Sequence, residues 1–195
     1  MKKVLGFDVS SSCIGYCLLE VNESTGEIKF KYCNYIKPIK KGSIIERLAH
    51  TRDKIISILE DAGPDIIAIE DIIQFMAGAS TAKTIIILTS FNRMIGLLAH
   101  DYLSAEPELF NVMAIRHGLK LNKEFPKKED MPELVSKHLG INFPYEKNKN
   151  GKMKIENYDM ADSVGVALYC ALLLTNKVKK KIIKLDLKKG RKSGH

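Results

Sequence analysis

The chain has 195 residues, 45% of them hydrophobic, so it can bury a full core, and its length favours one domain over two. It contains no run of about 18 uncharged apolar residues, and we therefore expect no membrane-spanning helix. The net charge is +8, and the segment before Asp8 is too short for a signal peptide, so we expect a cytoplasmic protein.

The first predicted strand, residues 4–7, ends in a carboxylate. Asp8 follows its apolar residues and precedes a break of serines at 10–12. Residues 14–21 resume an apolar run and residues 28–36 alternate, which predicts a meander of three strands. An aspartate in such a turn often bonds to its own backbone. Because other predicted elements also end in acids, a functional role is the alternative for Asp8.

A helix is predicted for residues 44–62, with Ser43 as its N-cap and Glu46 as the capping-box partner. The Gly-Pro pair at 63–64 would end it.

Residues 65–69 predict a strand that is buried on both faces and ends in Glu70. A strand reached through a helix normally pairs in parallel through a right-handed crossover, so we expect it beside the first strand. Sites in open α/β sheets form at the carboxyl ends of strands, where Asp8 and Glu70 both fall.

The next segment, residues 80–104, is long, apolar and helical in spacing. Apolar residues occupy more than one face, so it is either a central helix or a subunit interface. Residues 110–115 predict a fifth strand and residues 127–139 another helix. A polar, lysine-rich loop follows at 142–154.

The last predicted helix, residues 157–174, places Asp159 and Asp162 on one face near its start, with Asn157 as a candidate cap. The helix dipole alone could account for two acids there, at about 0.3–1 kcal/mol each. Beyond Asp162, however, the helix is apolar all round, which indicates burial on every side. Carboxylates entering a core are costly unless paired or bound to a cation, and this helix contains no lysine or arginine.

Four acids at the ends of apolar elements favour hard divalent cations over zinc. Two such ions can hydrolyse a phosphodiester. A glycosidase-type carboxylate pair is the other chemistry considered, but the chain has no tryptophan for a sugar platform. The four cysteines show no zinc spacing, and we expect reduced core thiols.

Three segments together resemble the RuvC family of Holliday-junction resolvases. GFDVSSSCIGYCLL is similar to the family's opening strand and turn, with the aspartate at Asp8. IIAIED is similar to the strand that ends in a glutamate, here Glu70. NYDMADSVGVAL is similar to the closing helix, with aspartates at Asp159 and Asp162.

The resemblance implies an α/β fold of the ribonuclease H-like class, with a five-stranded mixed sheet flanked by helices, over residues 1–176. It implies a homodimer, joined through the helix at 80–104, that resolves four-way and other branched DNA in a bacterial or phage-infected cell. Two Mg²⁺ or Mn²⁺ ions would serve each active site. The residues that would hold them and act in catalysis are Asp8, Glu70, Asp159 and Asp162.

The resemblance also indicates DNA contacts, with departures from the family pattern. The family's aromatic residue shortly after the glutamate falls at Ile73 here, and Phe75 lies two positions further on. Basic residues after the fifth strand are approximated with a spacing that is off by one. The expected DNA-binding residues are Phe75, Arg116, Lys120, Lys127, Lys128, Lys179, Lys180 and Lys181.

Residues 177–195 form a basic tail. From Lys177 to Lys192 there are nine basic residues and one acid, Asp186, so the tail carries the whole net charge and residues 1–176 are balanced. Such a tail suits a polyanion, because neutralised phosphates release counterions, or it is simply a solubilising terminus. On the resolvase interpretation it would add sequence-independent phosphate contacts and loosen selectivity toward other branched DNA.

Three other functions are alternatives to a junction resolvase. An ATPase of the actin and sugar-kinase superfamily also opens with a GxDxxSSxxGY loop, but its second phosphate loop and adenosine motif are missing from the sequence. A non-catalytic binder of branched DNA gains nothing from buried negative charge beside phosphates. A ribonuclease H-like enzyme acting on RNA or a hybrid stays open, because discrimination lies in contacts to the 2′-hydroxyl.

Overall fold

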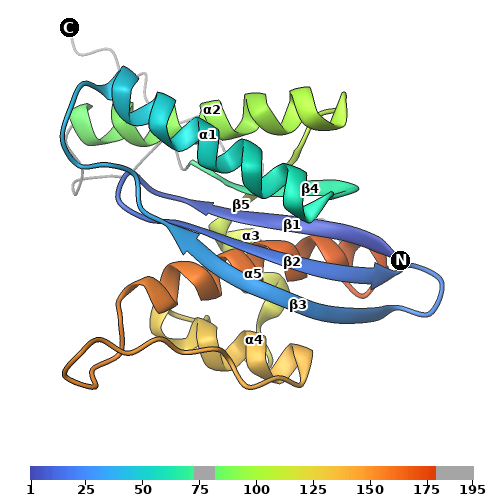
Figure 1. The fold of residues 1–195 in the computed structure, drawn as a ribbon. Helices are drawn as coiled ribbons and strands as arrows, with labels where there is room; N and C mark the ends of the chain where they lie inside the picture. Colours follow the sequence, from blue (N-terminus) through green and yellow to red (C-terminus); the bar gives the residue numbers. More distant parts are fainter. Residues whose placement is uncertain (73–81, 179–195) are drawn as a thin grey trace, which may run out of the picture.

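A five-stranded mixed sheet forms the centre of the protein (Figure 1). The computed structural model describes residues 1–72 and 82–178. Strands β1 (Lys2–Val9), β2 (Ile14–Asn22) and β3 (Glu27–Ile36) form an antiparallel meander, and β4 (Ile66–Asp71) and β5 (Glu108–Asn111) continue the sheet in parallel with β1. The strand order is β3-β2-β1-β4-β5, so the expected neighbourhood of the first and fourth strands is confirmed.

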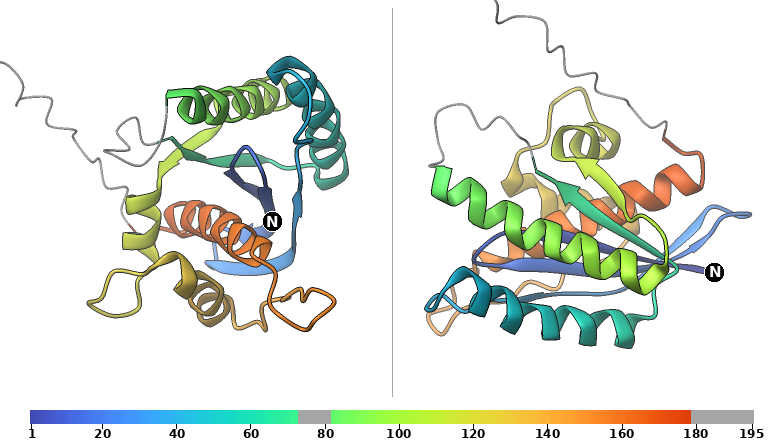
Figure 2. Two further views of the ribbon diagram at one scale, coloured as in Figure 1. Left: turned by 90° about the vertical axis from the view of Figure 1, so that its left-hand side faces the viewer. Right: turned by 90° about the horizontal axis from the view of Figure 1, so that it is seen from above.

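Helices cover both faces of the sheet, as the end-on view in Figure 2 shows. On one face, α1 (Ile44–Ala62) and α2 (Ala82–Leu103) pack over a core that includes Leu5 and Phe7. On the other face, α5 (Glu156–Leu174) lies against the sheet and is itself covered by α3 (Val112–Leu119) and α4 (Met131–Leu139). Because β1 is buried on both faces, its sequence is an almost continuous apolar run.

Helix α1 has the boundaries that its caps predict. The Ser43 side chain accepts a hydrogen bond from the Glu46 amide at 3.2 Å, and the Glu46 carboxylate accepts one from the Ser43 amide at 2.7 Å. Gly63 ends the helix in the left-handed conformation, with φ of 56°. Local sequence therefore determines both ends of this helix.

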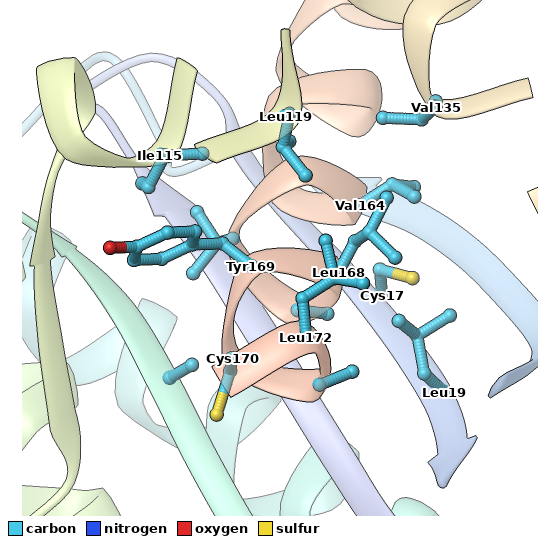
Figure 3. Close-up of a cluster of buried hydrophobic side chains, with 14 of the residues drawn as sticks. Cys17, Leu19, Ile115, Leu119, Val135, Val164, Leu168, Tyr169, Cys170 and Leu172 are labelled. Atoms are coloured by element: carbon cyan, nitrogen blue, oxygen red, sulfur yellow. The ribbon is translucent and has the colours of Figure 1, made fainter. Parts of the chain in front are cut away.

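Helix α5 is the most deeply buried helix among the described elements. Leu168, Tyr169 and Leu172 belong to the cluster in Figure 3, which joins the helix to strand residues such as Leu19 and to α3. The helix approaches β1 so closely that a Cβ on Gly6 would lie 2.6 Å from the Ala167 amide nitrogen. Glycine in the sheet thus sets how near α5 can lie to the strands.

Three sequence expectations are corrected. The fifth strand covers Glu108–Asn111, and the apolar residues after it begin α3, where the Asn111 side chain accepts from the Met113 amide at 2.8 Å. The segment predicted as one helix at 127–139 is a 3₁₀ turn, Lys128–Asp130, followed by α4. Asn157 does not cap α5: it is buried within the helix, and its side chain bonds to the backbone of Glu146.

Helix α2 exposes a strip of apolar side chains. Phe91, Ile95 and Ala99 are buried, whereas Ile86 and Leu97 are exposed. By length and composition this helix alone, among those described, could also cross a membrane, which is weak evidence because core helices of soluble proteins meet the same criteria. The expected absence of a membrane span stays a prediction.

Some expectations fall outside the described residues. Ile73 and the candidate wedge Phe75 lie in the segment 73–81, and Lys179, Lys180 and Lys181 lie beyond residue 178. The division into a body of residues 1–176 and a tail of residues 177–195 is likewise untested. None of the four cysteines forms a disulfide, and Cys13, Cys17 and Cys170 are buried.

Candidate active site

The four predicted carboxylates come from three elements that meet at one end of the sheet. Asp8 lies near the end of β1 and Glu70 near the end of β4, and the parallel pairing of Phe7 with Ile69 brings the two acids side by side. Asp159 and Asp162 lie in the first turns of α5.

Burial and mutual repulsion raise the pKa values of three of these carboxylates. Burial raises the pKa of Asp8 well above its ordinary value, and the charges of Glu70, Asp162 and Asp159 raise it further. Burial, with the charge of Asp162, raises the pKa of Glu70 to about 7. The pKa of Asp162 is raised to about 6, again mainly by burial. The site therefore concentrates negative charge that water does not fully solvate.

Two basic side chains from outside α5 partly neutralise this charge. The Lys128 ammonium lies 2.7 Å from Asp159 Oδ1 and 3.4 Å from Asp162 Oδ2. An Arg116 guanidinium nitrogen lies 3.9 Å from Asp162 Oδ1. Burial lowers the pKa of Lys128, but the hydrogen bond to Asp159 and the charges of Asp162 and Asp8 outweigh it, so that the net pKa is raised.

This pairing is not visible in the sequence. The last helix itself contains no basic residue, and the resemblance indicates DNA contacts for Arg116 and Lys128. Both residues are remote in sequence from Asp162, and no periodic pattern links them to it. Their positions follow instead from the packing of α3 and of the turn before α4 against α5.

The turn after Asp8 is held by a serine. Ser10 Oγ accepts from the Cys13 amide at 3.0 Å and donates to the Cys13 carbonyl at 2.7 Å. The local turn role that Asp8 could have had is thus performed by Ser10, which leaves the aspartate to the cluster.

Gly15 allows the start of α5 to lie close to Asp8. It pairs with Asp8 across the β1–β2 ladder, and a Cβ at this position would collide with the Asp159 carbonyl oxygen. The absence of a side chain there allows the first turn of α5 to contact the strands, so Asp159 and Asp162 can reach the charge of Asp8.

Helix α2 holds the end of β4. The buried Asn92 donates its side-chain amide to the Glu70 carbonyl at 2.9 Å, and Arg93 pairs with Asp71 at 3.2 Å. The backbone that carries the Glu70 carboxylate is therefore fixed from the opposite face of the sheet.

Solved structures resemble the chain over most of its length. A RuvC from Thermus thermophilus in complex with a Holliday junction substrate matches with a TM-score of 0.65 at 14% identity, covering 89% of this chain and 94% of that one. A second Thermus thermophilus RuvC structure gives 0.64 at 17% identity, covering 90% and 96%. The yeast mitochondrial Holliday junction resolvase Ydc2 gives 0.61 at 18% identity, covering 89% and 80%.

This chain has the RuvC fold. No family model matches it, and no curated protein matches its sequence. At these identities the likeness establishes the architecture, so the expectation of a ribonuclease H-like, five-stranded mixed sheet flanked by helices is confirmed.

The donor set in this RuvC fold suits a hard divalent cation. Carboxylate oxygens are ligands that Mg²⁺ and Mn²⁺ prefer, and burial raises the pKa values of Asp8, Glu70 and Asp162 here. Within residues 1–72 and 82–178, however, no three acidic, histidine or cysteine side chains are close enough to hold one ion. The Lys128 ammonium instead supplies positive charge beside two of the carboxylates.

The predicted DNA-binding residues that the structure describes fall into two groups, those that are exposed and those that pair with the carboxylates. Lys120 and Lys127 are exposed, Lys120 directly after α3 and Lys127 directly before Lys128. Arg116 and Lys128, by contrast, are engaged with the acids.

Proposed function

We propose that this protein is a structure-selective DNA endonuclease that resolves Holliday junctions and other branched DNA by metal-dependent phosphodiester hydrolysis. The observation that carries the proposal is the meeting of Asp8, Glu70, Asp159 and Asp162 at one end of the sheet. A cluster of this kind, in a fold shared with a protein solved on a Holliday junction substrate, supports nuclease chemistry.

Asp8, Glu70, Asp159 and Asp162 would hold two Mg²⁺ or Mn²⁺ ions. When bound, these ions supply an activated water and stabilise charge on the leaving oxygen. Strand and helix backbones carry all four carboxylates, and their side chains would have to move closer together than they are in the ion-free protein to share an ion. Lys128 and Arg116 offset the negative charge of the ion-free site, and with ions bound they would be available to pair with the substrate phosphate.

Substrate placement would use the exposed basic residues around this site. Lys120 and Lys127 lie where a phosphate backbone can reach them, and such contacts position a duplex without reading its sequence. A homodimer through α2 would present two sites to two strands of a junction, which symmetric cutting requires.

The deciding experiment incubates purified protein with a labelled four-way junction, a matching linear duplex and a three-way branch, each with Mg²⁺ or with chelator. Paired, metal-dependent nicks in the junction with the duplex spared are the expected result. RNA and RNA–DNA hybrid substrates serve as further controls. Cutting of these in preference to DNA would support the ribonuclease alternative. Binding without cutting by the wild type would contradict the proposal.

Asp8→Asn tests the site itself. It should keep junction binding and lose cleavage by a factor of about 100 or more, since it removes one charge from a preorganised cluster. Asp53→Asn, an exposed carboxylate on α1, is the matched control and should cut normally. Normal cutting by Asp8→Asn would remove Asp8 from the active site.

A further inference from the structure

A large apolar groove lies at the opposite end of the sheet from the carboxylates. Its volume is about 680 Å³, and its walls come from the start of β4, the segment after α2 and the end of α5. Ile66, Leu103, Leu173, Leu174 and Val178 supply much of its lining.

The groove is separate from the candidate active site. Along β4, Ile66 is four residues before Glu70, roughly 13 Å in a strand. Along α5, Leu173 is eleven residues after Asp162, roughly 16 Å in a helix. The catalytic proposal therefore does not use this surface, and an apolar surface of this size normally marks a binding site.

We propose that the groove binds the chain's own C-terminal segment, residues 182–187. Val178, the last described residue, is itself part of the groove lining, so the chain leaves the described structure from within the groove. Four residues later the sequence reads IIKLDL, which contains the apolar residues Ile182, Ile183, Leu185 and Leu187.

The groove and the segment 182–187 with its flanking lysines carry complementary charges. Asp65, Glu106 and Glu108 contribute carboxylates to the groove, and the apolar residues of the segment are flanked by lysines on both sides.

A segment tethered this closely has an effective concentration of about 1 mM, so even a weak intrinsic affinity populates the bound state. The basic residues from Lys188 onward would then be held at the end of the molecule far from the cut phosphate. There they would contribute affinity for DNA, while the position of cutting would depend on other residues.

Hydrogen exchange on the full-length protein tests the proposal, with mass spectrometry of peptides covering residues 103–110 and 171–178. The double variant Ile183→Asp, Leu185→Asp removes apolar contacts without altering any described residue. If the intrinsic Kd is about 0.1 mM, exchange in these peptides should become about tenfold faster in the variant. The matched control Gly190→Asp, Ser193→Asp adds the same two charges beyond the apolar segment and should exchange like wild type.

A change on the groove side gives an independent readout. Leu174→Asp should speed exchange in peptides that contain residues 182–187 and make trypsin cleave there sooner. Equal exchange in the wild type, in the Ile183→Asp, Leu185→Asp double variant and in Leu174→Asp would overturn the proposal. Protection that rises with protein concentration would also overturn it, because a second copy would then supply the segment. Neither readout depends on nuclease activity.

Discussion

At the scale of single residues, the carboxylate cluster makes stability depend on pH. The folded-state pKa values of Glu70, about 7, and Asp162, about 6, lie above their ordinary values of 4.5 and 3.8. Between these limits the folded protein binds more protons than the unfolded chain, so its stability falls as pH rises. In chelator, we expect denaturant unfolding to give a lower free energy of unfolding at pH 7.5 than at pH 5.

Divalent ions should reverse that dependence, because metal binds the deprotonated ligands. Added Mg²⁺ or Mn²⁺ should stabilise the protein more at pH 7.5 than at pH 5. Glu70→Gln should flatten the decline in chelator, since it removes one of the groups that titrate. A stability curve in chelator that rises from pH 5 to 7.5 would show that other groups dominate.

Lys128 is expected to substitute for a metal ion in the ion-free protein. Lys128→Gln leaves Asp159 and Asp162 without their nearest positive charge, and should lower the ion-free stability by about 1 kcal/mol, a modest figure because the lysine is 43% exposed. The increase in melting temperature on adding Mn²⁺ should be larger than in wild type. Lys137→Gln, which breaks a surface pair with Glu133, is the control and should change neither quantity appreciably. Equal stabilisation by Mn²⁺ in all three proteins would contradict this role.

At the scale of elements, Gly15 determines where α5 begins to contact the sheet. Gly15→Ala would force the Asp159 backbone away from β2, and should cost about 1–3 kcal/mol of stability together with most of the cleavage activity. Gly96→Ala on α2 meets no atom within 4 Å and should stabilise the protein by about 0.5–1 kcal/mol. Urea unfolding and junction cleavage measure both effects. An active, stable Gly15→Ala protein would show that α5 can shift without harm.

Elements whose signals are local could be predicted from the sequence. The caps of α1 predicted its boundaries, and the apolar runs of β1 and β4 predicted two strands with a carboxylate near the end of each. The strand boundaries were less accurate: β1 extends two residues beyond the predicted 4–7 at each end, and β4 continues past residue 69 to Asp71. The prediction of the fifth strand is wrong beyond Asn111 because the apolar run Val112–Ile115 is compatible with either a strand or a helix. Only the Asn111 cap distinguishes helix from strand there.

Contacts between distant segments could not be predicted in this way. The position of Asn157 predicts a helix cap, whereas its side-chain amide bonds to the backbone of Glu146, eleven residues earlier in the chain. The partners of Asp162 are supplied by α3 and by the turn before α4, and their distance in space depends on how those elements pack. The pattern of acids was visible in the sequence, but the basic residues that balance them were not.

At the scale of the whole molecule, the proposed homodimer would use the exposed apolar face of α2. Ile86 and Leu97 are 64% and 61% exposed, and their spacing of eleven residues places them on one face of the helix. The double variant Ile86→Glu, Leu97→Glu should raise the dimer Kd by about 100-fold or more, because unpaired charges would be buried. Sedimentation measures the assembly state, and junction cuts should become unpaired.

Ile45→Glu is the matched control for this prediction, since Ile45 on α1 is equally apolar and 70% exposed. It should leave the assembly state unchanged. A wild-type protein that sediments as a monomer at all concentrations would rule out dimerisation through α2.

The position of α5 in the sequence governs when the site can form. Its residues 156–174 supply two of the four carboxylates and cover a face of the sheet whose other residues, including Val4 and Leu19, are synthesised first. A nascent chain folds from its N-terminus, so that apolar face stays open until α5 emerges. A ribosome-bound chain that lacks α5 therefore has neither a complete carboxylate cluster nor a covered sheet, and its exposed strands are where aggregation would begin.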